Sequence, residues 1–358
     1  MTHILIFSFG LRGAGGTETV LEEWHKNLTK EQGYYLDILT FGKGSLLDNA
    51  FFQDKNVTVL PAGKPAHWLG AALHLHKLLK KQHYDYIFCL SFSQLFITHY
   101  VLKTLPRSIR DTIKVFYWAH FMLHPAQFNT RNRRLLGAVD GALSLCSGMS
   151  ESFEQLGLPA RKIHTVYNPV SRAEFKPKSK NGNRFYYIGR LIDEPKRVSD
   201  IIKTFNILIN QNHQKAYLDI IGIGESLPLY QSLIQEYNLS DYITIHNQWL
   251  SDPWSHIPEI DALILSSKAE GFGMVIAEAL ARGVPVISSN CEVGPKELII
   301  DSNNGYLYDV GDINQLADCI HNIMKGCLKT SPSEISSSIE RMYTDNYFSR
   351  IQKILSPS

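Results

Sequence analysis

The chain has 358 residues, of which 44% are hydrophobic and 20% charged, and its formal net charge is +2. This length suits two domains, and the composition is that of a folded globular protein rather than a disordered chain. No apolar run approaches the ~20 residues of a membrane span, and the scattered cysteines lack zinc or redox spacing. We therefore expect a cytoplasmic protein with free thiols and no nucleic-acid partner.

Short apolar runs alternate with helical stretches along the whole chain, which predicts α/β layers with parallel sheets. The first residues lack a basic segment and a cleavage site, so they predict a strand rather than a signal peptide. In the first half, strands are expected over 3–9, 35–40, 57–60, 86–90, 114–118, 141–145 and 162–166. Helices are expected near 17–30, 68–81, 93–105 and 148–156.

A polar segment rich in Pro, Lys, Asn and Gly, residues 176–183, is typical of a linker. The pattern then restarts, with strands expected over 184–188, 216–221, 242–246, 261–265 and 284–288 and helices near 198–210, 227–237 and 313–325. We therefore expect an N-terminal domain over residues 1–170 and a C-terminal domain over 171–335. A final helical segment is expected over 336–358.

The first glycine-rich loop lies between the strand 3–9 and the helix that follows it. Gly15 and Gly16 allow backbone N–H groups to approach a phosphate closely. A dinucleotide fingerprint from Gly13 would need a glycine where Glu18 stands, and a Walker loop from Gly10 would need a lysine where Gly16 stands. Both assignments fail, and a bare glycine turn is the plainer alternative.

Two cations follow the strand 184–188. Gly189 ends the strand, Arg190 offers a planar guanidinium fork, and Lys196 offers a compact charge. Arg197 is an alternative to Lys196 in register, and a solvated loop is the plainer interpretation of all three. After the next strand, Gly222 and Gly224 again allow backbone to pass close to a ligand.

The most informative stretch begins with the apolar strand 261–265. Glycines at 271 and 273 then open an alanine-rich helix, whose free N–H groups suit an anion or a cluster of hydroxyls. Glu270 lies in the loop and Glu278 lies two turns along the helix, so both can face one ligand. An amphipathic helix with incidental glutamates is the alternative.

This stretch, together with residues 281–287, resembles the C-terminal signature of the retaining, nucleotide-sugar glycosyltransferases of family four. The resemblance implies the GT-B fold, in which two Rossmann-like α/β domains face each other across a cleft. It also implies that the last helical segment, beginning near Pro332, returns to the N-terminal domain.

Local details over 15–20, 166–170 and 288–295 resemble a bacterial branch that extends the lipopolysaccharide core. The resemblance implies an enzyme that moves a hexose from a UDP-sugar to the lipopolysaccharide core or a related surface glycan. Galactose is the hexose that we expect. Two alternatives stay open. One is transfer of glucose or N-acetylglucosamine to another polysaccharide or lipid-linked glycan, and the other is a nucleotide-sugar epimerase of the same fold.

The resemblance also implies roles for individual residues. Arg190 and Lys196 would neutralise the leaving diphosphate, and Glu278 would hold the ribose hydroxyls. Glu270 would hold the sugar hydroxyls together with the backbone at the start of the helix. That backbone comprises Gly271, Phe272, Gly273 and Met274.

Other residues are placed near the donor or the acceptor by the same resemblance. His120, after the strand 114–118, would lie near the sugar and the acceptor, with His124 as a competitor. The remaining donor contacts would be Gly15, Gly16, Gly189, Gly222, Gly224 and Gln248. Family members usually have a glycine near Gln248, so this contact departs from the pattern. Trp249 and Trp254 either stack on a ligand ring or pack in the core.

No metal ion or other cofactor is expected. No Asp-x-Asp motif follows a strand, no cluster has metal-ligand spacing, and two cations already suit the diphosphate. Residues 1–170 carry 18 Lys and Arg against 12 Asp and Glu. This excess predicts an anionic partner, either lipopolysaccharide or the inner face of the inner membrane, held peripherally and released by salt. A solvated surface is the plainer alternative.

Overall fold

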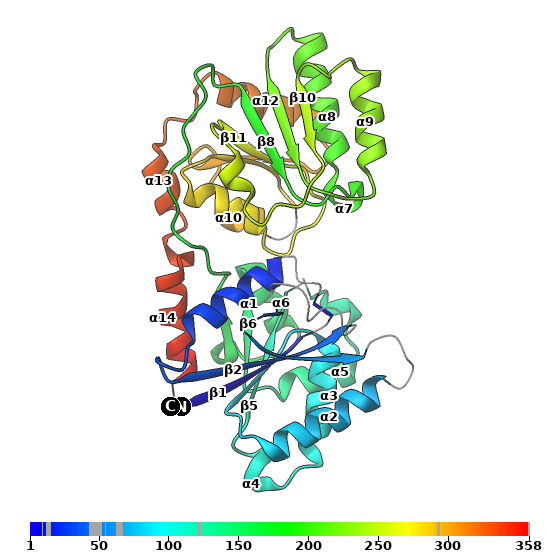
Figure 1. The fold of residues 1–358 in the computed structure, drawn as a ribbon, viewed down its shortest axis with the longest axis vertical. Coiled ribbons are helices and arrows are strands. Elements are labelled where there is room, and N and C mark those ends of the chain that lie inside the picture. Colours follow the sequence, from blue (N-terminus) through cyan, green and yellow to red (C-terminus); the bar gives the residue numbers. More distant parts are fainter. Residues whose placement is uncertain are drawn as a thin grey trace. The chain divides into compact units, whose positions relative to one another are not determined.

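The computed structural model describes residues 1–8, 10–11, 16–42, 52–53, 55–61, 67–120, 123–291 and 294–356. The chain divides into two compact units, Met1–Pro169 with Tyr347–Ser358 and Val170–Asn346. Each unit is built around one parallel β-sheet with helices on its faces (Figure 1). The predicted fold class of two Rossmann-like α/β domains is therefore confirmed.

The first unit contains a seven-stranded sheet in the order β3-β2-β1-β4-β5-β6-β7. Its interior strand β1 is apolar and fully buried from Ile4 to Phe7, as a strand covered on both faces must be. The strands are β1 (Thr2–Phe7), β2 (Tyr34–Gly42), β3 (Asn56–Pro61), β4 (Tyr86–Cys89), β5 (Lys114–Trp118), β6 (Gly141–Ser144) and β7 (Ile163–Thr165). The helices are α1 (Gly16–Asn27), α2 (His67–Lys81), α3 (Phe92–Lys103), α4 (Arg107–Arg110), α5 (Thr130–Gly137) and α6 (Ser147–Gln155).

The last helix, α14 (Thr344–Leu355), packs mainly in the first unit. The indole of Trp24 on α1 donates a hydrogen bond to the Tyr347 hydroxyl at 2.9 Å, and the Tyr86 hydroxyl donates to the Leu355 carbonyl at 3.0 Å. The preceding α13 (Pro332–Ser337) lies in the second unit. The chain therefore passes from the second unit to the first at Tyr347, inside α14. The sequence predicts this boundary at residue 336.

The second unit contains a six-stranded sheet in the order β10-β9-β8-β11-β12-β13. The strands are β8 (Arg184–Ile188), β9 (Tyr217–Ile221), β10 (Ile243–His246), β11 (Ala262–Leu265), β12 (Val286–Ser289) and β13 (Gly305–Tyr308). The helices are α7 (Asp193–Lys196), α8 (Val198–Asn206), α9 (Leu227–Glu236), α10 (Met274–Ala281), α11 (Pro295–Leu298), α12 (Ile313–Met324) and α13. Helix α8 packs against α9 and α12, and α10 packs against α13; Figure 1 shows α8 and α9 on the opposite side of the sheet from α10.

Some elements differ from the sequence prediction. The helix expected over 198–210 ends at Asn206 and continues as a single π-helical turn, Ile207–Gln211. The segment from Pro332 is interrupted between α13 and α14 by a 3-10 turn, Glu340–Met342. The sequence does not predict strand β13, because its four residues follow a run of polar turn residues and form only the edge of the sheet.

Candidate active site

The site residues of the second unit gather where its strand order reverses. Strand β8 lies between β9 and β11. From β8 the chain first adds β9 and β10 toward one edge of the sheet, and it then returns to add β11, β12 and β13 toward the other edge. In open parallel sheets, ligands bind at such a switch point, beyond the carboxyl ends of the strands. Arg190 follows β8 and Glu270 follows β11, so both leave the sheet at this point.

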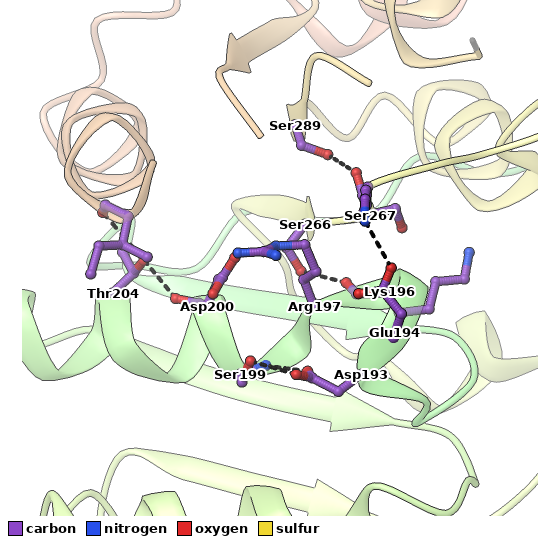
Figure 2. Close-up of polar contacts among 12 residues, drawn as sticks. Asp193, Glu194, Lys196, Arg197, Ser199, Asp200, Thr204, Ser266, Ser267 and Ser289 are labelled. Carbon is purple, nitrogen blue, oxygen red and sulfur yellow. Dashed lines mark hydrogen bonds and ion pairs between the residues drawn. The ribbon is translucent and has the colours of Figure 1, made fainter. Parts of the chain in front are cut away.

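Lys196 and Glu270 form an ion pair at the switch point. The Lys196 Nζ lies 2.5 Å from Glu270 Oε1, and the two side chains are only 17% and 10% exposed. The two loops are tied together elsewhere as well. The Ser266 hydroxyl donates to the Lys196 carbonyl at 2.8 Å, as Figure 2 shows, and the Lys268 N–H donates to the Pro195 carbonyl at 2.9 Å. The structure thus brings together two predicted residues that are 74 positions apart.

Arg197, the alternative to Lys196, has a different partner. Its backbone is left-handed, with φ of 52°, and its Nε lies 2.7 Å from the Oδ2 of Asp200, a buried side chain on α8 (Figure 2). Lys196 and Arg197 therefore point to different partners although they are neighbours in sequence. This geometry favours Lys196 as the cation of the site.

Glu270 uses one carboxylate oxygen within the protein. Oε1 accepts hydrogen bonds from Lys196 and from the Ser267 hydroxyl, the latter at 2.6 Å. Ser267 is itself held, because the Ser289 hydroxyl donates to its carbonyl at 2.5 Å (Figure 2). Within the described part of the chain, Oε2 receives no hydrogen bond. One oxygen is therefore fixed and the other is offered to a ligand.

The loop from Gly271 to Gly273 leads into α10. Gly273 caps the helix with φ of 83°, a left-handed conformation that favours glycine. Phe272 is buried, and a Cβ on Gly294 would lie 2.7 Å from its carbonyl oxygen, so the backbone is closely supported from behind. The N-terminus of α10, beginning at Met274, is consequently held beside Glu270.

Glu278 lies on α10 and also has one oxygen held by the protein. The indole N–H of Trp254 donates to Glu278 Oε2 at 3.0 Å. The sequence allows two roles for Trp254, stacking on a ligand ring or packing in the core. The structure buries the ring and directs its polar edge to Glu278. No local signal marks this contact, because the two residues are 24 positions apart on separate elements.

The predicted glycines Gly189, Gly222 and Gly224 support the loop that carries Arg190. A Cβ on Gly222 would lie 1.8 Å from the Gly189 carbonyl oxygen, and a Cβ on Gly224 would lie 2.2 Å from that of Leu191. Only glycine fits where backbones approach this closely. Burial raises the pKa of Tyr187 well above its ordinary value, and this protonated phenol donates to the Arg190 carbonyl at 3.0 Å.

Arg190 and Gln248 have exposed side chains. Among the described residues, no carboxylate forms an ion pair with the Arg190 guanidinium. Gln248 lies in the turn after β10, where its backbone N–H donates to the His246 carbonyl at 2.9 Å. Trp249 beside it is also exposed. These side chains are accessible to a ligand, whereas that of Trp254 is not.

The remaining predicted residues belong to the first unit. Gly16 is the exposed first residue of α1, and Gly15 lies outside the described residues. His120 follows β5 and is only 6% exposed, and among the described residues its Nε2 has no hydrogen-bond partner. Its ring lies against Trp118, with 4.8 Å between centroids. Burial lowers the pKa of His120 to about 3, whereas His124 is exposed.

Three further observations concern metal ligands, membrane spans and cavities. In the described ranges, no group of three or more His, Cys, Asp and Glu side chains is arranged to hold a metal ion. None of the described helices has the length and hydropathy needed to cross a membrane. An open depression of about 660 Å³ is lined by Ile300, Asn303 and residues of the segment 329–338. Its lining contains none of the predicted site residues, so we assign it no catalytic or binding role.

Comparison with known families agrees with this geometry. The family described as Glycosyltransferase Family 4 matches residues 14–174, and the one described as Glycosyl transferases group 1 matches residues 171–334. The chain is 27% identical to lipopolysaccharide 1,6-galactosyltransferase of Escherichia coli K12, over 96% of this chain and 95% of that protein. It is also 27% identical to the Salmonella typhimurium enzyme of the same name, over 94% and 93% of the two chains.

Solved structures show the same fold. The apo form of the lipopolysaccharide outer core galactosyltransferase WaaB superposes with a TM-score of 0.82 at 25% identity, covering 98% of both chains. HepE of Anabaena, in complex with UDP and glucose, superposes with a TM-score of 0.76 at 18% identity, covering 98% of this chain and 99% of that one. With both family matches and the site geometry, the chain belongs to the GT-B glycosyltransferases that join a family 4 domain to a group 1 domain.

Proposed function

We propose that this glycosyltransferase transfers galactose from UDP-galactose to a hydroxyl of the lipopolysaccharide core, with retention of configuration at the anomeric carbon. The observation that carries the donor assignment is the Lys196–Glu270 ion pair beside the N-terminus of α10. The names of the two relatives that align over nearly the whole chain support the sugar and the acceptor. Complexes of HepE with UDP and with UDP-glucose support a uridine nucleotide as the leaving group.

The cations suit a leaving diphosphate. As the bond to the anomeric carbon breaks, negative charge accumulates on the phosphate oxygens, and fixed positive groups lower the energy of that state. Lys196 has three N–H donors, of which one is directed to Glu270, so two remain for phosphate. The exposed guanidinium of Arg190 supplies a second charge. We propose that these two cations take the place of a metal ion.

The two glutamates suit two sets of hydroxyls. Oε2 of Glu270, with the N–H groups that begin α10, would hold hydroxyls of the transferred sugar. The remaining oxygen of Glu278 would hold the ribose. In the retaining reaction the leaving phosphate oxygen takes the acceptor proton as the new bond forms, so the mechanism needs no separate side-chain base.

A surface of the first unit suits an anionic membrane. Helix α2 exposes Leu69 (64%) and Leu73 (55%), and the exposed Lys77 and Lys80 continue the same helical stripe. Next to its start, an aromatic depression of about 400 Å³ is lined by Trp68, Phe92, Ser93, Phe96 and Asn132. Leucines beside lysines favour shallow insertion between anionic head groups. We propose a peripheral contact with the inner face of the inner membrane.

The function is tested with purified protein, lipopolysaccharide that lacks its core galactose, and separate UDP-galactose, UDP-glucose and UDP-N-acetylglucosamine. We expect release of UDP with UDP-galactose, and a new α-glycosidic bond detected by NMR. A new bond made only with glucose or N-acetylglucosamine would reject the sugar. UDP-glucose formed from UDP-galactose without a new bond would identify an epimerase and reject the transfer.

The assignment of the two glutamates is tested by calorimetry. Glu278→Gln should weaken the binding of UDP itself, because the ribose is present in both UDP and UDP-galactose. Glu270→Gln should leave UDP binding unchanged and weaken the additional binding that the sugar provides. An equal loss of UDP affinity in both variants would contradict the assignment.

A further inference from the structure

We propose that Trp254 is a positioning residue that fixes the Glu278 carboxylate for the ribose of the donor. This inference rests on the proposed function, because it takes Glu278 as the ribose ligand. Trp254 makes no contact with the substrate in this proposal. It acts through Glu278, and its indole N–H is the group that matters.

The contact is geometrically well defined. The indole N–H donates to Glu278 Oε2 at 3.0 Å, and the Trp254 side chain is only 3% exposed, so water does not compete for the bond. The backbone of Trp254 is also held, because Asp252 Oδ1 accepts from its N–H at 3.1 Å at the start of the short 3-10 helix Pro253–His256. Both the backbone and the indole of Trp254 are thus held by hydrogen bonds.

Arg282 packs against the same ring. Its guanidinium carbon lies 4.8 Å from the centroid of the Trp254 ring, a distance typical of cation–π stacking. Its Nη1 donates to the Glu278 carbonyl at 2.9 Å. Arg282 thus contacts both the ring and the helix turn that carries Glu278. The guanidinium therefore braces the indole and the backbone of this turn, while the indole holds the carboxylate.

The arrangement has a direct consequence for binding. A glutamate on a helix surface samples several rotamers, and a ligand that needs one of them must order the side chain on binding. An indole is a donor only, so it fixes an ionised carboxylate and cannot exchange roles with it. With Oε2 held by Trp254, Oε1 is presented to the ribose before the nucleotide arrives. Trp254 is thereby expected to increase affinity for the ribose without touching it.

The test compares UDP with 2′,3′-dideoxy-UDP, which lacks both ribose hydroxyls. Trp254→Phe keeps a buried aromatic ring and removes the N–H. We expect it to weaken UDP binding by on the order of tenfold, the usual effect of one hydrogen bond to a charged group. Binding of dideoxy-UDP should stay within twofold of wild type, because Glu278 then has no hydroxyl to hold. Trp254→His, which keeps an N–H donor, should recover part of the UDP affinity.

A double-mutant cycle separates this proposal from the proposed function. Trp254→Phe combined with Glu278→Gln should bind UDP no more weakly than Glu278→Gln alone. If Glu278→Gln weakens UDP binding and Trp254→Phe does not, the positioning role is overturned and the ribose assignment stands. If Glu278→Gln leaves UDP binding unchanged, the ribose assignment fails and the inference fails with it.

The control is Trp24→Phe, which removes a buried, hydrogen-bonded indole from the first unit. It should lower the thermal stability and leave UDP affinity unchanged. Equal losses for UDP and dideoxy-UDP in Trp254→Phe would show general damage to the site and overturn the proposal. A measurement on the unaltered protein guards against misfolding of the variant. The NMR signal of the Trp254 indole N–H should shift with UDP and stay in place with dideoxy-UDP, and equal shifts with both would also overturn it.

Discussion

At the scale of single residues, the proposed donor site is organised by carboxylates that each have one oxygen held by the protein. Glu270 is held by Lys196 and Ser267, and Glu278 is held by Trp254. Each partner is itself anchored, for example Ser267 by the Ser289 hydroxyl. A site of this kind is formed before its ligand binds, so binding requires little reorganisation.

Lys196→Ala should reduce turnover far more than it reduces UDP binding. The charge on the diphosphate grows as the bond to the sugar breaks, and loss of one preorganised electrostatic group costs about 3 kcal/mol, or roughly a hundredfold in kcat. Steady-state kinetics and calorimetry with UDP measure the two effects separately.

Arg197→Ala is the matched control for Lys196. Removing Arg197 leaves the buried Asp200 without its ion pair, so we expect a loss of about 2 kcal/mol in the free energy of unfolding. Turnover of the folded protein should change little. If Lys196→Ala kept normal turnover and Arg197→Ala abolished it, the assignment of the cation would be reversed.

His120 should remain neutral from pH 8 to pH 5. Burial lowers its pKa to about 3, below the ordinary value of about 6.5, so the native state favours the neutral imidazole. The unfolded chain takes up this proton first. His120 therefore contributes stability above pH 6.5 that is lost as the pH falls toward 3, by up to about 1.4 kcal/mol per pH unit.

Histidine NMR signals followed from pH 8 to pH 5 measure this directly, with the exposed His124 as the internal comparison. A midpoint near 6.5 for His120 would contradict the burial that the structure gives it. The pH dependence of unfolding should be shallower in His120→Asn than in the wild-type protein.

At the scale of elements, the loops after β8 and β9 depend on close backbone contacts. The glycines that the sequence suggested for ligand approach also have a structural role here, because Gly222 and Gly224 pack against the carbonyls of Gly189 and Leu191. A local pattern cannot distinguish the two roles, since both require the absence of a side chain.

Gly222→Ala should destabilise the second unit by about 3 kcal/mol, because its Cβ would overlap the Gly189 carbonyl oxygen and displace the loop that carries Arg190. Gly70→Ala is the control. Gly70 lies within α2 and a Cβ added there would meet open space, so alanine should stabilise that helix by up to about 1 kcal/mol. Urea unfolding of both variants is the measurement, and equal stability of Gly222→Ala and wild type would disprove the packing argument.

At the scale of the whole molecule, activity should survive an excess of EDTA. Two cations suit the diphosphate, and the described residues contain no cluster arranged for a metal ion. The assay is UDP release before and after chelation, followed by addition of magnesium or manganese. Activity that disappears in EDTA and returns with either metal would reject the metal-free mechanism.

The protein should also sediment with vesicles of anionic phospholipid at low salt and be released at high salt, because the attraction is screened over ~8 Å at physiological ionic strength. Replacing Lys77, Lys80 and Lys81 together by glutamate should abolish sedimentation. The matched control replaces Lys178, Lys180 and Lys329, which are exposed lysines of the second unit, and should sediment normally. If the two triple variants sedimented equally, the membrane contact would be rejected and the lysines of α2 would merely be solvated.

Local sequence patterns are enough to predict the fold class and the loops that follow the strands. Alternation of apolar runs with helical stretches reports burial on both faces of a parallel sheet, and this is a local property of the chain. The glycines and charges after the strands 184–188 and 261–265 were likewise visible, because ligand loops follow the carboxyl ends of such strands. The resemblance to family four implies their roles, which stay predictions.

Which side chains meet depends instead on how distant segments pack. Lys196 and Arg197 are adjacent, but the left-handed backbone at Arg197 turns its side chain to Asp200 and leaves Lys196 for Glu270. The contact of Trp254 with Glu278 joins two elements 24 positions apart. Periodicity fixes the face on which a residue lies within its own helix or strand. It does not fix the direction of a loop or the partner across the sheet, because these follow from packing between segments that are distant in sequence.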